Sequence, residues 1–255
     1  MTGDAEPAAA ERVPGRRRLV RTVLTGAAVL SAGLLSGPGP APAGPGSGSA
    51  GATSPGTAKR RPAGPDTALR ELAAGNRRWR TLHEKHPDET RTVRQALLGG
   101  QHPFAVVLGC VDSRVPPELV FDQGLGDLLT VRSAGEVLDE AVLGSIAYGV
   151  LELDIPLVVV LGHQSCGAVA AAVHADGSGA ELPAHMQYLV DQIRPAIDRK
   201  LRGDARVDAA ITANVLLVRA RLAAEPELAA RIAAKRLAVV GARYELGSQR
   251  VHRVG

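Results

Sequence analysis

Two continuous apolar runs rich in valine dominate the hydrophobic pattern of this chain. They are FAVVLG at residues 104–109 and PLVVVLG at residues 156–162. Such runs are typical of strands that are covered on both faces of a parallel sheet. The pattern also predicts a strand at 128–132 and a last one at 237–246.

Apolar residues at helical spacing alternate with these strands. A first helix is predicted to begin with Asp66 as its N-cap, and Gly75 weakens its middle. The alternation of strands and helices predicts an α/β fold, a single domain with a mainly parallel sheet flanked by helices. The other predicted helices cover 88–98, 140–153 and two amphipathic stretches, one with Leu189, Ile193, Ile197 and Leu201 and one with Ile211, Val215, Val218 and Leu222.

The charge of the chain is unevenly distributed. Its formal net charge is +4, but residues 66–255 carry 22 basic and 23 acidic residues. The excess of positive charge therefore lies in residues 1–65, and a nucleic-acid-binding surface on the folded part is not expected. Aromatic residues are only 2% of the chain, so the core must be built mainly from Ala, Val, Leu and Ile.

The N-terminal residues 1–43 have the features of an export signal. Basic residues precede the apolar run at 22–35, and the small residues at 41–43 offer a cleavage site. The apolar run is shorter than the roughly 20 residues that a membrane helix needs, so no stable membrane span is expected after cleavage. Arg16 and Arg17 resemble a twin-arginine signal, which predicts a secreted or cell-envelope protein.

Other interpretations of this segment remain open. An ordinary secretory signal or an uncleaved anchor would have a similar pattern, and the protein would be cytoplasmic if the signal were not used. Residues 44–65, rich in Gly, Pro, Ala and Ser, are predicted to be a flexible linker. The folded domain is then predicted to span 66–255.

Residues able to bind a soft metal ion follow both valine-rich strands. Cys110 comes directly after the first strand, and His163 and Cys166 follow the second. Ligands bind beyond the carboxyl ends of parallel strands, so these side chains would meet if the two strands are neighbours. Two thiolates and one imidazole make a zinc site with one open position, which is typical of catalytic zinc. Asp112 can accept a hydrogen bond from Arg114 within reach of such a metal.

Each of these features also has a simpler interpretation. The two cysteines could form a disulfide in an exported protein, although that would leave His163 unexplained. Asp112 and Arg114 could form a purely structural salt bridge. Nucleotide binding is the weakest interpretation, because the chain has no G-x-G-x-x-G motif.

The segments CVDSR at 110–114 and GHQSCGA at 162–168 resemble the β-class carbonic anhydrases. The resemblance extends over about 66–246 and includes the segments 116–135 and 141–163. It implies a zinc enzyme that reversibly hydrates carbon dioxide to bicarbonate and a proton, with a homodimer as its basic unit. It also implies Cys110, His163 and Cys166 as the zinc ligands, and Asp112 and Arg114 as a catalytic dyad that orders the metal-bound water.

Three positions bear on the pocket that this resemblance implies. Glu136 stands where Asn is common in the family, so a carboxylate is expected at the rim of the pocket. Leu129 stands where Phe is frequent, which leaves the pocket poorer in aromatic residues. Gln123 resembles a family position that reaches the pocket, although a polar turn residue would fit the same pattern.

The expected ligand set also indicates a mechanism. Two thiolates cancel the formal charge of Zn²⁺, so hydroxide forms on this zinc less readily than on zinc held by three imidazoles. The hydroxide would attack the carbon of CO₂ while Asp112 accepts its hydrogen bond and orients it. Gly167 and Ala168 leave room for a small apolar substrate. The alternatives are a non-catalytic zinc protein that binds bicarbonate or a partner, and a disulfide-stapled binding module of the cell envelope.

The interpretation of residues 1–43 predicts twin-arginine export. Residues 1–50 fused to a reporter that folds in the cytoplasm should be exported, and changing Arg16 and Arg17 to Lys should block that export. Unchanged export of the Lys variant would indicate the general secretory route. If the reporter is not exported at all, that result would argue for a cytoplasmic enzyme.

Overall fold

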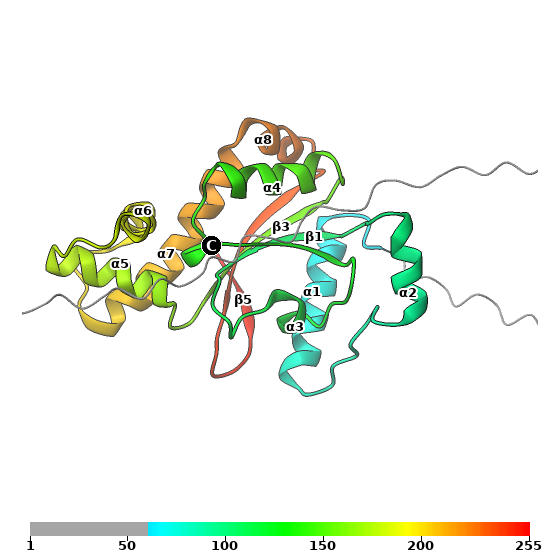
Figure 1. Cartoon of the computed structure of the whole chain (residues 1–255), viewed down its shortest axis with the longest axis horizontal. Coiled ribbons are helices and arrows are strands. Elements are labelled where there is room, and N and C mark those ends of the chain that lie inside the picture. Colours follow the sequence, from blue (N-terminus) through cyan, green and yellow to red (C-terminus); the bar gives the residue numbers. More distant parts are fainter. Residues whose placement is uncertain (1–60) are drawn as a thin grey trace, which may run out of the picture. The chain divides into compact units, whose positions relative to one another are not determined.

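Five strands form one sheet in the order β2-β1-β3-β4-β5 (Figure 1). The first four are parallel, and β5 runs antiparallel to β4. We describe residues 61–255 of a computed structural model. The strands are β1 (Ala105–Gly109), β2 (Leu128–Arg132), β3 (Leu157–His163), β4 (Ala238–Tyr244) and β5 (Val251–Val254).

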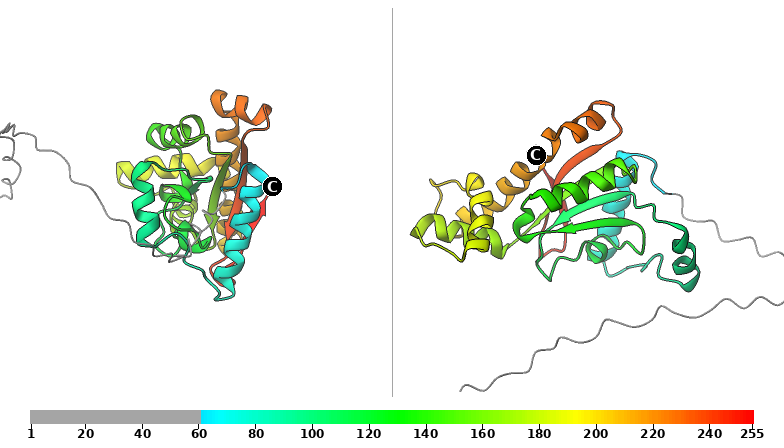
Figure 2. Two further views of the ribbon diagram at one scale, coloured as in Figure 1. Left: turned by 90° about the vertical axis from the view of Figure 1, so that its right-hand side faces the viewer. Right: turned by 45° about the horizontal axis from the view of Figure 1, so that its top comes forward.

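Helices cover both faces of this sheet, as the views in Figure 2 show. Helix α1 contacts α3 and β3 on one face, while α4 and α7 pack against the sheet on the other. The α-helices are α1 (Pro65–Arg80), α2 (Arg91–Ala96), α3 (Pro117–Val120), α4 (Glu140–Leu151), α5 (Gly167–Ser178), α6 (Ala184–Ile193), α7 (Gly203–Ala224) and α8 (Pro226–Ala233), and the short 3₁₀ turns are η1 (Leu97–Gly99), η2 (Ala134–Glu136) and η3 (Arg194–Ala196).

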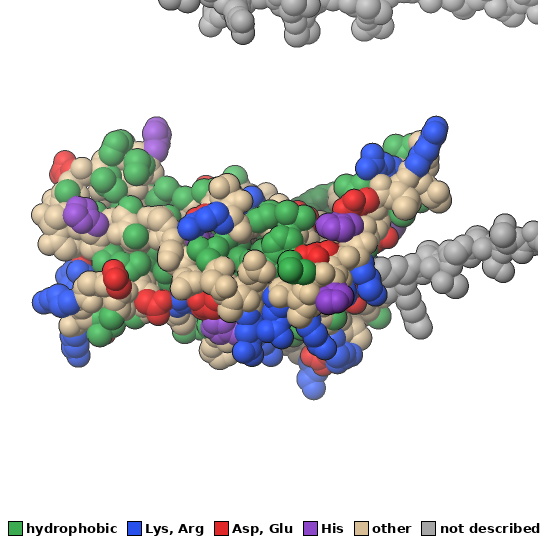
Figure 3. All heavy atoms as spheres, turned by 90° about the horizontal axis from the view of Figure 1, so that it is seen from below, with side chains coloured by type: hydrophobic (Ala, Val, Ile, Leu, Met, Phe, Trp, Pro, Cys, Tyr) green, Lys and Arg blue, Asp and Glu red, His purple; other side chains and the backbone are tan. Residues whose placement is uncertain are grey.

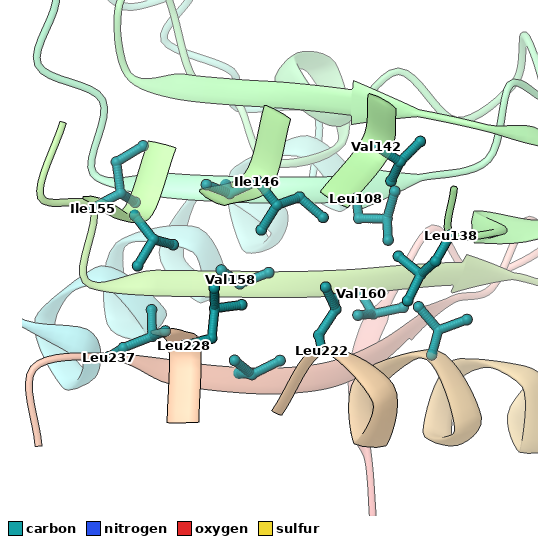
Figure 4. Packing of buried hydrophobic residues seen from close by; sticks show 14 of the residues in the cluster. Leu108, Leu138, Val142, Ile146, Ile155, Val158, Val160, Leu222, Leu228 and Leu237 are labelled. Atoms are coloured by element: carbon teal, nitrogen blue, oxygen red, sulfur yellow. The ribbon is translucent and has the colours of Figure 1, made fainter. Parts of the chain in front are cut away.

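The alternation of side chains along each strand divides the core into two clusters. Val158 and Val160 of β3 belong to the cluster shared with α4, α7 and α8 (Figure 4). Val159 and Leu161 belong to the cluster under α1. All of these side chains are buried, so both faces of β3 lie in the core, as its unbroken apolar sequence predicts.

The structure confirms the predicted fold class and strands. The four strands expected from the sequence agree with β1 to β4 within two residues at each end. Helix α4 and the buried face of α7, formed by Ile211, Val215, Val218 and Leu222, are confirmed as well. Helices α5 and α8 and strand β5 were not predicted.

Two helix predictions were wrong in detail. The N-cap of α1 is Gly64, and Asp66 lies in the first turn instead. The stretch from Leu189 to Leu201 is not one helix, because α6 ends at Ile193 and a 3₁₀ turn containing Pro195 follows. Proline lacks the backbone N–H that a continued helix needs, which explains this break.

The predicted export signal at 1–43 lies outside the described residues, as does all of the predicted linker except residues 61–65. Within the described range, none of the helices has the length and hydrophobicity needed to span a bilayer.

Gly75 lies where α1 approaches the chain after α3 most closely. A Cβ atom at this position would overlap the carbonyl group of Phe121 and lie 2.9 Å from Nε2 of Gln123. The glycine that weakens the helix in the sequence is therefore required by packing.

Gly75→Ala should lower the free energy of unfolding by about 1–3 kcal/mol, although alanine favours helix by about 1 kcal/mol. Gly144→Ala in α4 is the matched control, because no atom lies within 4 Å of its added Cβ. The control should be stabilised by about 0.5–1 kcal/mol in urea denaturation. Equal stabilisation of both variants would contradict the close packing of α1.

Candidate metal centre

The ends of β1 and β3 bring three potential metal ligands together. Cys110 follows β1 directly, His163 is the last residue of β3, and Cys166 is the N-cap of α5. Because β1 and β3 are paired neighbours, their carboxyl ends lie side by side. The ligand atoms of the three residues all lie within 4.8 Å of one another, and all three side chains are buried.

His163 is held in the orientation that a metal ligand needs. Its Nδ1 lies 2.9 Å from the carbonyl oxygen of Gln164, and Nδ1–H donates to that oxygen when it carries the proton. The lone pair is then on Nε2, which is buried and has no hydrogen-bond partner among residues 61–255. A buried nitrogen lone pair beside two sulfur atoms fits a metal ion.

The two cysteines are free thiols, with their Sγ atoms 3.9 Å apart. A disulfide would need about 2.05 Å, so the structure does not support the disulfide interpretation. A hydrogen bond from Cys166 lowers the pKa of the Cys110 thiol, while the same pairing and burial raise the pKa of Cys166. One proton shared by the pair leaves Cys110 as the thiolate, and a metal ion would replace that proton.

Asp112 and Arg114 form a bidentate pair at the edge of this cluster. Nε and Nη2 of Arg114 donate to the two carboxylate oxygens of Asp112 at 2.9 and 2.7 Å. The backbone N–H of Arg114 donates to Oδ1 of Asp112 as well. These bonds hold the pKa of Asp112 well below its usual range, so the carboxylate is ionised. Its Oδ2 lies 3.9 Å from Nε2 of His163.

Arg132, at the end of β2, was not singled out from the sequence. Its Nε donates to the carbonyl oxygen of Cys110 at 2.8 Å, and its Nη2 donates to that of Asp112 at 2.7 Å. Arg132 pairs with Gly109 in the sheet, which places it beside the loop after β1. The sequence did offer one signal for Arg132, since it is the only charged residue of the strand LLTVR and stands at the end of that strand.

The turn η2 supports Cys110 from another side. The backbone N–H of Gly135 donates to Sγ of Cys110 at 3.4 Å, and Nδ2 of Asn214 from α7 donates to the carbonyl oxygen of Gly135 at 2.7 Å. Gly135 has a φ of 65°, a left-handed conformation that glycine adopts without strain. Asn214 was also missed, since a single buried Asn in an amphipathic helix carries no pattern.

Glu136 does not lie at the rim of the pocket, so that expectation was wrong. Its side chain is 2% exposed, and Gly135 and Glu136 both have positive φ values in the turn that places it inside the domain. Burial, and next the charge of Cys110, raise its pKa well above the usual range. Oε1 of Glu136 and Oδ1 of Asn214 both lack a hydrogen-bond donor among the described residues, which also favours the neutral acid.

A cavity of about 330 Å³ opens beside this Cys-His-Cys cluster. Gly167 and Ala168 line it, as expected for a site that admits a small apolar molecule. Gln123 and Leu129 do not line it in this chain: Gln123 donates to the carbonyl oxygen of Phe121, and Leu129 packs against the core under α4. The remaining lining residues are Cys110, Val111, Asp112, Ala134, Ala171, Leu182, Met186, Leu189 and Val190.

Residues 105–251 match the family model described as "Carbonic anhydrase". The chain is 43% identical over 191 residues to carbonic anhydrase 2 of Mycobacterium tuberculosis, covering 73% of this chain and 91% of that protein. It is also 43% identical over 190 residues to a carbonic anhydrase of Mycolicibacterium smegmatis, covering 73% and 92%.

Solved structures of β-carbonic anhydrases have the same fold as this chain. A Coccomyxa β-carbonic anhydrase in complex with acetazolamide is 26% identical, with a TM-score of 0.59 over 72% of this chain and 85% of that one. A β-carbonic anhydrase from Sordaria macrospora, one of two described as tetrameric, has the same fold at 22% identity, with a TM-score of 0.59 over 73% and 96%.

The burial of Glu136 has a consequence for stability. Its pKa in the folded protein lies above that of the unfolded chain, so the folded state keeps a proton that the unfolded state loses. Stability should therefore fall as pH rises from about 4.3 towards the folded pKa. Glu136→Gln keeps the shape of the neutral acid and has no such proton.

We expect Glu136→Gln to gain stability relative to the parent as pH rises over this window, by at most about 1.4 kcal/mol per pH unit. Urea denaturation at several pH values measures the difference. Glu140→Gln, at an exposed position in the first turn of α4, is the control and should show no such trend above pH 6. A Glu136→Gln curve parallel to the parent would show that Glu136 is ionised.

Proposed function

Because this chain belongs to the β-class carbonic anhydrases, we propose that it catalyses the reversible hydration of carbon dioxide to bicarbonate and a proton with a zinc ion held by Cys110, His163 and Cys166. The observation that carries this proposal is the buried Cys-His-Cys cluster, which lies beside an ionised carboxylate and opens onto an apolar cavity.

The donor set favours zinc. Thiolate sulfur and imidazole nitrogen are its preferred ligands, and three protein ligands leave a fourth position open, as in catalytic sites. When bound, zinc would supply the hydroxide that attacks the carbon of CO₂. Thiolates at Cys110 and Cys166 would cancel its formal charge, so hydroxide would form less readily than on zinc held by three imidazoles. Hydration should therefore be faster at mildly alkaline pH than at acid pH.

Asp112 is the residue suited to orient the attacking group. Its carboxylate stays ionised, so it can only accept hydrogen bonds, and Arg114 occupies both of its oxygens in a fixed plane. A carboxylate held in this way can accept the hydrogen bond of a hydroxide and direct its lone pair away from itself. Arg114 therefore acts by positioning Asp112 and by keeping it away from the metal.

The cavity is suited to a small substrate without charge. Val111, Ala168, Met186 and Leu189 present only apolar atoms there, apart from backbone groups. Linear CO₂ needs no hydrogen bonds to enter such a space, whereas charged bicarbonate is poorly solvated in it. This difference favours release of the product once it forms.

The proposal includes assembly and export. A homodimer or higher homo-oligomer is supported by the family and by the tetramers described for Sordaria macrospora. Export through a twin-arginine signal is supported by the sequence of residues 1–43, and no nucleic-acid partner is proposed.

Metal analysis and a CO₂ hydration assay on one set of variants test this function. The parent should carry one zinc per chain, and Cys110→Ala, His163→Ala or Cys166→Ala should each remove it and lower the melting temperature. Arg114→Ala should keep its zinc while losing at least about tenfold in hydration rate, because Asp112 is no longer held. Arg114→Lys should recover only part of this loss, since lysine cannot bind both oxygens in one plane.

Two results would contradict the proposal. Full zinc retention in any of the three alanine variants would remove that residue from the ligand set. Stoichiometric zinc in the parent without CO₂ hydration would indicate the non-catalytic zinc protein instead.

A further inference from the structure

A second cavity, of about 390 Å³, opens between α1 and the hairpin formed by β4 and β5. It shares no lining residue with the cavity beside the metal ligands. Its floor is apolar, since Leu72, Phe121, Val159 and Val240 belong to the core cluster under α1. A cavity of this volume with an apolar floor is typical of pockets that bind small molecules.

Arginines surround this floor on both sides. Arg70, Arg77 and Arg80 come from one stripe of α1, and Arg250 and Arg253 come from the β4–β5 hairpin. Figure 3 shows Lys and Arg side chains gathered at the lower middle edge of the face seen from below, with a few Asp, Glu and His side chains beside them. The nearly neutral charge of residues 66–255 therefore conceals a local excess of positive charge.

No ion pair within residues 61–255 neutralises these five arginines, and no Asp or Glu lines the cavity. Neighbouring arginines differ, because Arg78 pairs with Asp122 and Arg243 pairs with Asp208. Several uncompensated guanidinium groups around one cavity attract an anion, and each can bind a carboxylate through two hydrogen bonds.

Asn76 keeps the two walls of the cavity at a fixed separation. Its side chain is buried in α1, and its Nδ2 donates to the carbonyl oxygens of Val120 and Gln249, both at 3.0 Å. Its Oδ1 accepts from the backbone N–H of Val251 at 2.9 Å. The cavity is therefore formed before any ligand arrives, which reduces the entropic cost of binding.

We propose that this cavity binds an anionic amphiphile, a small molecule with a carboxylate head and an unbranched apolar chain. The apolar floor accommodates the chain, and the arginines on the rim bind the head. Residues 1–60 are a poor occupant because they are net positive themselves. A second copy that docked its own arginine-lined face against this one would bring like charges together.

Calorimetric titration of the zinc-loaded, full-length protein with decanoate, below its micelle concentration, tests the proposal. Decanoate should bind with one molecule per chain and at least about tenfold more tightly than decan-1-ol, which has the same chain without the charge. Decyltrimethylammonium should not bind, because the arginines repel it. Failure of decanoate to bind, or equal binding of decanoate and decan-1-ol, would overturn the proposal.

Matched variants assign the binding to this cavity. Arg70→Gln combined with Arg77→Gln should weaken decanoate binding at least about tenfold, while Arg91→Gln combined with Arg94→Gln on α2 should leave it unchanged. Ala73→Leu, which narrows the cavity at an exposed position, should weaken decanoate and decan-1-ol alike. Unchanged binding in the Arg70 and Arg77 variant would contradict the site.

Sedimentation of the same variants tests the alternative occupant. If neutralising Arg70 and Arg77 changes the oligomeric state, the surface is a contact between copies and the proposal is wrong. Zinc content and CO₂ hydration should be the same in all these variants and in the parent. The binding proposal and the proposed CO₂ hydration are thus tested by different measurements, so one can be contradicted while the other stands.

Discussion

The pairing of β1 with β3 is the constraint on which the candidate metal centre depends. Both strands end at the same edge of the sheet, with Gly109 opposite Leu161, so the residues that follow them must lie close together. Parallel pairing also requires connections that cross over the sheet, and α4 provides the one that leads into β3. The ligands are thus positioned by buried valines and leucines rather than by a flexible loop.

The residues around the ligands act mainly to fix the backbone. Arg132 holds the carbonyl groups of Cys110 and Asp112, and Asn214 holds the turn whose N–H reaches the Cys110 sulfur. Neither side chain enters the cavity. Their hydrogen bonds hold the segment after β1 and the turn η2 in place, and this preorganises the cluster for a metal ion.

The meeting of Cys110, His163 and Cys166 could be predicted from the sequence because its signals are local. Cys110 and His163 come directly after unbroken apolar runs in the sequence, so a residue type that binds metals stands out there. Glu136 could not be placed in the same way, because two consecutive left-handed residues turn it into the domain and no local pattern indicates that turn. The end of α6 could have been predicted from Pro195, but the spacing of Ile193 and Ile197 suggested a continuous helix.

X-ray absorption at the zinc edge of the purified, full-length protein tests the metal centre most directly. We predict two sulfur ligands at about 2.3 Å, one imidazole nitrogen at about 2.0–2.1 Å and one further light atom. One metal ion can have all three of these ligands only if the carboxyl ends of β1 and β3 lie side by side, as they do in the sheet. A spectrum with fewer than two sulfur ligands, or without an imidazole, would contradict it.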